Sequence, residues 1–222
     1  DRAAIEAQNA RLMRVDPSMH DLQALPARLP HAQVLAWIAA LAQPPAKPLF
    51  DGDGEPVAKA TLDALVGNRN LAAIPALEPA RFGMVVRRSA LRAFPTTLRV
   101  FDSTDDTDID RFQESALFPG TPVVLAHESR DGLWWFVVSP RYAAWVQKAD
   151  VAEGARRDVL AQVAKTPYRI VTGASATTVF TPEQPALSQL KLDMGVRVPV
   201  LAGWPADRPV NGQHPYTSYV IE

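Results

Sequence analysis

The side chains that most often perform enzyme chemistry are absent from this sequence or poorly spaced in it. None of the 222 residues is cysteine, which excludes a thiol nucleophile, thiolate metal ligands and disulfides. The four histidines, at positions 20, 31, 127 and 214, have no spacing that would bring two of them to one helix face or one loop. No Gly-x-Ser-x-Gly turn offers a serine nucleophile. We therefore predict no catalytic residue, no metal site and no cofactor in this chain.

An aspartate-rich segment, "DSTDDTDID" at 102–110, could supply oxygen ligands to calcium. Its last three alternating aspartates end at Asp110, and their spacing fits the first positions of a calcium loop. That loop also needs a glycine and a bidentate glutamate, where this sequence has Arg111 and Leu117. We interpret the segment as a solvated loop between strands, with Asp110 as its one candidate functional residue.

An aromatic cluster lies within "DGLWWFVVSPRYAAWVQKADVA", residues 131–152, which holds Trp134, Trp135, Tyr142 and Trp145. Successive side chains of a strand point to opposite faces, so Trp134 and Trp135 must face opposite ways. We expect most of these rings to form the core of a small barrel and at least one to stay exposed. An exposed ring beside Tyr142 would suit a carbohydrate or peptide ligand.

The first eighty residues have helical patterns broken by proline and glycine. Apolar residues recur at helical spacing over 1–13, 31–42 and about 57–66, and "VDPS" and "QPPAKP" end the first two helices. The second helix should bury one face formed by Val34, Trp37, Ile38 and Leu41. These patterns predict a small helical unit at 1–80.

Short strands replace helices after Pro79. "FGMVVRRS", "TPVVLAHES", "LWWFVVS" and "AAWVQK" are each followed by turn signals, and a similar block begins at "YRIVTGASATTVF" and runs to "PYTSYVIE". We predict an α+β chain with one SH3-like β-barrel at 81–152, a connector helix at 153–166 and a second SH3-like barrel at 167–222. The second barrel stops within an apolar run, so we expect it to be truncated.

Three segments of the strand region carry a family resemblance. They are "RFGMVVRRSALRAFPT", "DIDRFQESALFPGTPVVLAHESRDGLWWFVVSPRYAAWV" and "KADVA", and they resemble the first bacterial SH3 domain of NlpC-type cell-wall peptidases. "DGDGEP" and "NRNLAAIP" fit the helical unit that precedes two such barrels in that family, and "GQHPYTSYVIE" fits the second barrel. The chain departs from the family at Ala144, where glycine is common, and in lacking the papain-like catalytic domain.

The resemblance implies a pocket on the first barrel that limits which peptides reach the catalytic groove. Asp110 would accept a peptide ammonium, Gln113 would contact an amide, and Tyr142 would supply a hydroxyl and a wall. One ring of the tryptophan cluster, for which we name Trp145, would form the floor. Arg88, from "RRSALR", would bind peptide carboxylates. The alternative is that Tyr142 is a turn residue, Gln113 an internal strut, and at least two of these arginines surface ion-pair partners.

The resemblance also implies a function and partners. The chain would be the non-catalytic front of a cysteine endopeptidase that cleaves γ-D-glutamyl–diamino acid bonds in peptidoglycan, located in the cell envelope. Its partners would be the stem peptides of peptidoglycan and the C-terminal catalytic domain of the same protein. The alternatives are a free-standing wall-binding module and an SH3-like adaptor without an enzymatic role.

Charge and hydropathy narrow the choice of partners. Lysine and arginine number 23 against 24 acidic residues, so the net charge of −1 gives no field to attract nucleic acid. No apolar run approaches the roughly 18 residues of a membrane span, and the N-terminus lacks the basic-then-apolar order of a signal peptide. We expect neither a nucleic-acid partner nor a membrane span.

Overall fold

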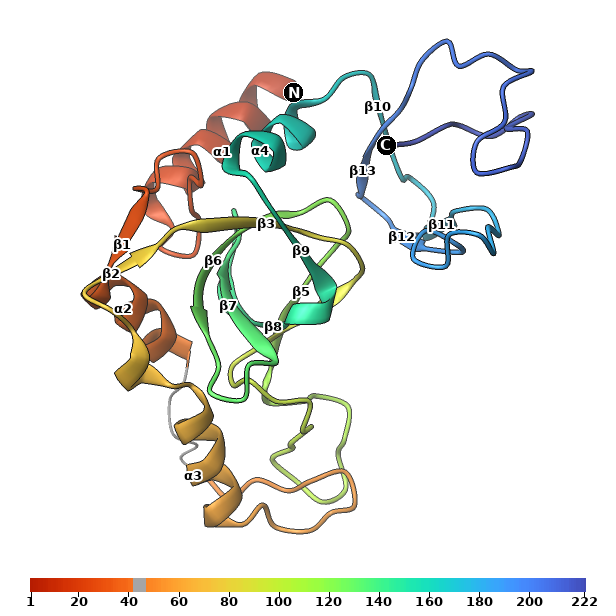
Figure 1. Cartoon of the computed structure of the whole chain (residues 1–222). Coiled ribbons are helices and arrows are strands. Elements are labelled where there is room, and N and C mark those ends of the chain that lie inside the picture. Colours follow the sequence, from red (N-terminus) through yellow and green to blue (C-terminus); the bar gives the residue numbers. More distant parts are fainter. Residues whose placement is uncertain (42–46) are drawn as a thin grey trace.

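Seven antiparallel strands form the largest sheet of the protein (Figure 1). The computed structural model describes residues 1–41 and 47–222. In sequence order the strands are β3 (Arg81–Val85), β4 (Ser89–Arg92), β5 (Gln113–Leu117), β6 (Pro122–Glu128), β7 (Trp134–Val138), β8 (Ala143–Gln147) and β9 (Val151–Gly154). Their spatial order is β5-β4-β8-β7-β6-β3-β9, and the strands curl around a common interior (Figure 1).

The sheet is apolar on both faces. Along β7, Trp134, Phe136 and Val138 belong to one buried cluster, whereas Trp135 and Val137 belong to another. We call the first the helix-side cluster, because it includes residues of the N-terminal helices, and the second the strand cluster, because strand residues dominate it. This alternation follows from the period of two along a strand, and it requires a covering layer on each face.

All three rings of the tryptophan cluster are buried. Trp134 is 5% exposed, Trp135 8% and Trp145 0%. The predicted opposite orientation of Trp134 and Trp135 is confirmed by their separate clusters. The expectation that one ring stays exposed was wrong, because both faces of the sheet are covered. Trp134 and Trp145 pack on the helix-side face, so they are not part of the strand cluster.

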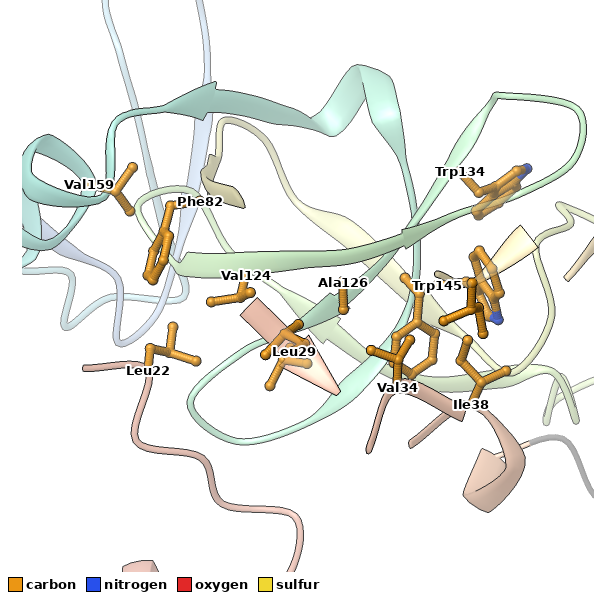
Figure 2. Packing of buried hydrophobic residues seen from close by; sticks show 13 residues of the cluster. Leu22, Leu29, Val34, Ile38, Phe82, Val124, Ala126, Trp134, Trp145 and Val159 are labelled. Carbon is orange, nitrogen blue, oxygen red and sulfur yellow. The ribbon is translucent and has the colours of Figure 1, made fainter. Parts of the chain in front are cut away.

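The N-terminal segment covers the helix-side face. Its elements are α1 (Arg2–Val15), β1 (Arg28–Pro30), α2 (His31–Leu41), α3 (Lys59–Asn68), η1 (Leu71–Ala73) and β2 (Leu77–Pro79). Figure 2 shows Leu29, Val34 and Ile38 facing Ala126 and Trp145 of the sheet. The three predicted helices are present, and α2 buries Val34 and Ile38 as expected. The predicted end of the second helix, Ala42, and the start of "QPPAKP" at 43–46 lie outside the described residues.

Two features of this segment had no signal in the sequence. The strands β1 and β2 pair antiparallel, with Leu29 opposite Glu78, and so tie the start of α2 to the start of the large sheet. The helix α1 buries none of its side chains. The docking of the segment therefore depends on α2, the β1–β2 pair and the end of α3.

The C-terminal end of α3 is held by the β6–β7 hairpin. The His127 ring is 4% exposed, and its Nε2 lies 3.1 Å from the carbonyl oxygens of both Arg69 and Asn70. The Asn68 side chain donates to Asp131 (2.9 Å) and accepts from the backbone N–H of the same residue (3.1 Å). The His127 contacts reach carbonyl groups that the end of a helix leaves free, and the Asn68 bonds tie the last residue of α3 to the hairpin.

The residues after β9 form smaller elements. The helix α4 (Arg156–Ala164) matches the predicted connector, and four short strands follow: β10 (Tyr168–Ile170), β11 (Ser175–Thr177), β12 (Lys191–Asp193) and β13 (Arg197–Pro199). They pair as two separate two-stranded sheets, β10–β13 and β11–β12. This pairing does not establish the second barrel, which stays a prediction. Within the described part of the chain, no helix combines the length and hydropathy that crossing a bilayer requires.

We predict that Gly83→Ala destabilises the sheet. A Cβ at Gly83 would lie 2.7 Å from Val151 Cγ1 and 3.0 Å from the Ala152 carbonyl oxygen, because β3 runs between two partner strands. The free energy of unfolding in urea should fall by about 1–3 kcal/mol. Gly52→Ala is the control, because nothing lies within 4 Å of its Cβ position. Equal stability of the two variants would contradict the close packing of β3 against β9.

We predict that acid weakens the attachment of α3 through His127. Burial lowers the pKa of His127 from its usual 6.5, against the opposing effects of the Asn70 and Arg69 carbonyls and of Glu128. The unfolded chain therefore takes up a proton near pH 6.5 that the folded chain resists, so stability is lost as pH falls below that value. The free energy of unfolding should decrease from pH 7 to pH 5, and His127→Gln should reduce the decrease. Exposed His214→Gln should leave it at the wild-type size; an equal effect of both variants would contradict the assignment.

Candidate functional site

An open cavity of about 500 Å³ lies beside β4, between the sheet and the loop that joins β4 to β5. The sheet contributes the side chains of Ser89, Ala90, Arg92, Gln113, Trp134 and Gln147. The loop contributes Thr96, Thr97, Arg99, Asp108, Ile109 and Asp110. The cavity thus has a sheet on one side and the aspartate-rich loop on the other.

A buried guanidinium fixes this loop to the sheet. Arg92 is 4% exposed, and it pairs in register with both Gln113 of β5 and Trp145 of β8. Its Nε donates to the Thr96 carbonyl oxygen at 3.1 Å, its Nη2 donates to the Leu98 carbonyl oxygen, and its Nη1 forms an ion pair with Asp110. One side chain therefore holds three points of the cavity wall, which uses the fixed fork of donors that arginine provides.

Asp110 completes this arrangement. Its Oδ1 accepts from the backbone N–H groups of Phe112 (3.0 Å) and Val100 (3.3 Å), while Oδ2 faces Arg92. Its side chain is only 9% exposed. Asp110 lines the cavity, but its carboxylate is already paired with Arg92 and hydrogen-bonded. Its demonstrable contacts are those of a loop anchor, and a role in binding an ammonium stays a prediction.

The predicted residues Gln113 and Tyr142 lie apart. Gln113 lines the cavity, where its amide donates to the Ser115 carbonyl oxygen. Tyr142 is not among the lining residues; its hydroxyl donates to Glu114 Oε2 at 2.7 Å. Burial and this hydrogen bond raise the pKa of Tyr142 to about 12, so the phenol stays a neutral donor. The sequence reasoning missed Glu114, which neighbours Gln113 on β5.

Trp145 does not form the floor of the cavity. It is fully buried and packs edge-on against Phe136, with ring centroids 5.4 Å apart. The tryptophan that lines the cavity is Trp134. Trp145 is absent from the cavity wall because it lies where the helical segment covers the sheet.

The arginines of "RRSALR" have three different environments. Arg87 Nε lies 3.2 Å from Asp150 Oδ1, and Arg88 Nη1 lies 3.9 Å from Asp193 Oδ1 at the edge of the C-terminal strands. Arg88 is not among the residues that line the cavity, and its carboxylate-binding role stays a prediction for the exposed surface. Arg87 and Arg88 are thus surface ion-pair partners, as the alternative expected for at least two of these arginines, whereas Arg92 makes its ion pair in the interior.

The sequence reasoning also missed Arg99, Thr97 and Gln147. The alternation of side chains could have placed Gln147 on the face of Trp145, two residues away. Arg99 and Thr97 belong to an irregular loop, for which the sequence offers no periodicity. No group of three or more histidine or acidic side chains within residues 1–41 and 47–222 is arranged to hold a metal ion.

Two comparisons with known proteins agree with this geometry. Residues 99–147 match a family model described as an SH3 domain of the SH3b1 type, so the segment from the cavity loop to β8 is similar to such a domain. A solved structure described as a novel NlpC/P60 endopeptidase from Photobacterium damselae subsp. piscicida superimposes with a TM-score of 0.68 at 17% identity. That match covers 91% of this chain and 46% of that chain, so this chain spans about half of the neighbour's length. No curated protein gives a significant match.

We predict that Arg92→Met releases the cavity loop. Removing one partner of a buried ion pair leaves the Asp110 carboxylate unpaired, which should lower the free energy of unfolding by about 3–5 kcal/mol. Arg111→Met is the control, because the Arg111–Asp102 pair is exposed and should contribute at most about 1 kcal/mol. Amide hydrogen exchange of Val100 and Phe112, which both donate to Asp110, should accelerate only in Arg92→Met. Unchanged exchange would show that Asp110 holds the loop without Arg92.

Proposed function

We propose that this chain is the non-catalytic N-terminal portion of a peptidoglycan endopeptidase that cleaves γ-D-glutamyl–diamino acid bonds in the cell envelope. The observation that supports this most is the SH3b1 match over residues 99–147 within a fold similar to that of an NlpC/P60 endopeptidase. In this proposal the chain contributes no nucleophile, because it has no cysteine. Its part is to bind the stem peptides of the cell wall and to limit which of them reach the catalytic centre.

The proposed organisation is a helical unit at 1–80, a first SH3-like barrel at 81–152, a connector at 153–166 and a second SH3-like barrel at 167–222. The open cavity supports a ligand-binding role for the first barrel, since Asp110 and Gln113 both lie in its wall. Tyr142, just before β8, and Glu114 of β5 form a second polar pair. Trp145 supports the barrel from inside, and Arg88 would contact peptide carboxylates on the surface.

Exposed apolar side chains on the C-terminal segment support a docking role toward a catalytic domain. The most exposed of them are Val179, Phe180, Met194, Tyr216 and Tyr219. Two-stranded sheets are marginally stable by themselves, and an apolar surface rimmed by polar residues is typical of an interface. We propose that the catalytic domain of the same protein covers this surface.

The test is cosedimentation of the purified chain with peptidoglycan sacculi. We expect the chain to pellet with intact sacculi and to be retained about tenfold less when an amidase has removed the stem peptides. The chain alone should release no peptide from the sacculi. Chitin, which has a similar glycan but no peptides, is the control. Failure to pellet with intact sacculi, or equal retention on chitin, would contradict peptide binding by this chain.

A further inference from the structure

Most polar groups of the cavity are already bonded within the protein. Arg92 and Asp110 pair with each other, and Ser89 Oγ donates to Asp150 Oδ2 at 2.8 Å. Thr96 Oγ1 accepts from the Leu98 backbone N–H at 3.0 Å. A ligand in this cavity would therefore interact with the polar groups that have no hydrogen bond or ion pair within the protein.

Arg99 is the cavity residue that combines a fixed position with free donors. Its Nη2 donates to the Thr107 carbonyl oxygen at 3.2 Å, its Nε lies 3.9 Å from Asp110 Oδ2, and its guanidinium carbon lies 5.1 Å from the centroid of the buried Phe101 ring. Its side chain is nevertheless 60% exposed. The Nη1 atom makes no hydrogen bond to any described residue. A guanidinium held on one edge and open on the other is suited to a carboxylate.

Asp108 is the free acid of the same cavity. Its backbone N–H donates to Asp106 Oδ1 at 3.1 Å, which shapes the loop, but its own carboxylate has no hydrogen bond or ion pair within the described part of the chain. An exposed carboxylate of this kind accepts up to several hydrogen bonds from an ammonium group.

The charges of the cavity balance. Of its four charged side chains, Arg92 and Asp110 pair in the interior, and Arg99 approaches Asp110 only through Nε, at 3.9 Å. The Nη1 edge of Arg99 and the Asp108 carboxylate remain for a ligand. A ligand with one negative and one positive group would satisfy both without adding net charge, whereas a simple anion or cation would leave one of them unpaired. Trp134 and Ile109 line the same cavity and suit a small apolar side chain.

We propose that this cavity binds a zwitterionic amino-acid or short-peptide ligand, with Arg99 holding its carboxylate and Asp108 its ammonium group. The identification of that ligand as a cell-wall peptide rests on the proposed function. The arrangement of charges in the cavity is independent of the proposed function. The two residues that select the ligand are then different from Asp110, both of whose carboxylate oxygens are bonded within the protein, and from Arg88, which does not line the cavity.

The experiment is an NMR titration of the full chain with alanine, dialanine and trialanine, in which the two charges are increasingly far apart. The Trp134 indole N–H and the backbone amides of Arg99 and Asp108 report binding. We expect one length to bind best, and its N-acetylated form and its C-terminal amide each to bind about tenfold more weakly. Equal binding of the free and doubly blocked forms, or no saturable shift with any of the three, would overturn the proposal.

Two exposed-site variants assign the roles. Arg99→Gln should weaken binding of the free peptide and remove the preference for acid over amide, and Asp108→Asn should remove the preference for the free over the acetylated amine. Arg111→Gln and Asp105→Asn are controls, because both residues lie outside the cavity lining. Loss of neither preference in either variant would show that other groups bind the ligand.

The outcomes separate this inference from the proposed function. Saturable, charge-dependent binding of dialanine without retention on sacculi would support the zwitterion site and contradict a peptidoglycan role. If the Arg99→Gln and Asp108→Asn variants both bind sacculi at the wild-type level, that result would support the peptidoglycan-binding role. It would also overturn the proposal that this cavity contacts the peptidoglycan.

Discussion

The burial of the central sheet on both of its faces is the constraint on which the rest of the structure depends. A strand such as β7 presents Trp134, Phe136 and Val138 to one side and Trp135 and Val137 to the other, and each side is apolar. Curling lets the strands cover one face themselves, but the other face needs a separate layer. The N-terminal segment supplies it through Leu29, Val34 and Ile38 (Figure 2). Burial of each such side chain contributes roughly 1.5–3 kcal/mol, so the barrel and this segment stabilise one another.

That layer also determines where the cavity can be. On the helix-side face, the helical segment covers Trp145, whereas Trp134 lies beside the cavity. The loop between β4 and β5 arches beside this part of the sheet and is fastened there by Arg92. A long irregular loop would otherwise lose much conformational entropy on ordering, and the buried guanidinium replaces regular hydrogen bonding with three contacts from one side chain. The cavity thus exists because the helical segment leaves this part of the sheet uncovered, and because the loop held by Arg92 forms a rigid wall beside it.

Periodic patterns made much of the fold predictable. The three N-terminal helices, strands β3, β6, β7 and β8, the helix α4 and the opposite facing of Trp134 and Trp135 all follow from spacing along the chain, whereas β4, β5 and β9 were not predicted as separate strands. The β1–β2 pair was not predictable, because three-residue strands with a proline at one end carry no period. The burial of all three tryptophans was not predicted, for a related reason. The alternation of side chains along a strand shows that the sheet has two faces, but it does not show that a segment forty or more residues away in the sequence covers the second face.

The candidate site was predictable only in part, and the reason is physical. The sequence identified Asp110 and Gln113, which do line the cavity, because they sit beside recognisable motifs. The sequence could not show which charged side chains would pair with each other within the protein, since ion pairing depends on contacts such as that of Arg92 with Asp110, eighteen positions apart. A charged residue can serve a ligand only when the fold leaves it unpaired and holds it still. Arg99 is held by Phe101, Thr107 and a 3.9 Å approach to Asp110, but its Nη1 edge has no partner among the described residues, whereas both carboxylate oxygens of Asp110 are bonded. The residues that a motif marks can therefore be those that build a site, while the residues that bind its ligand lie beside them in the less patterned loop.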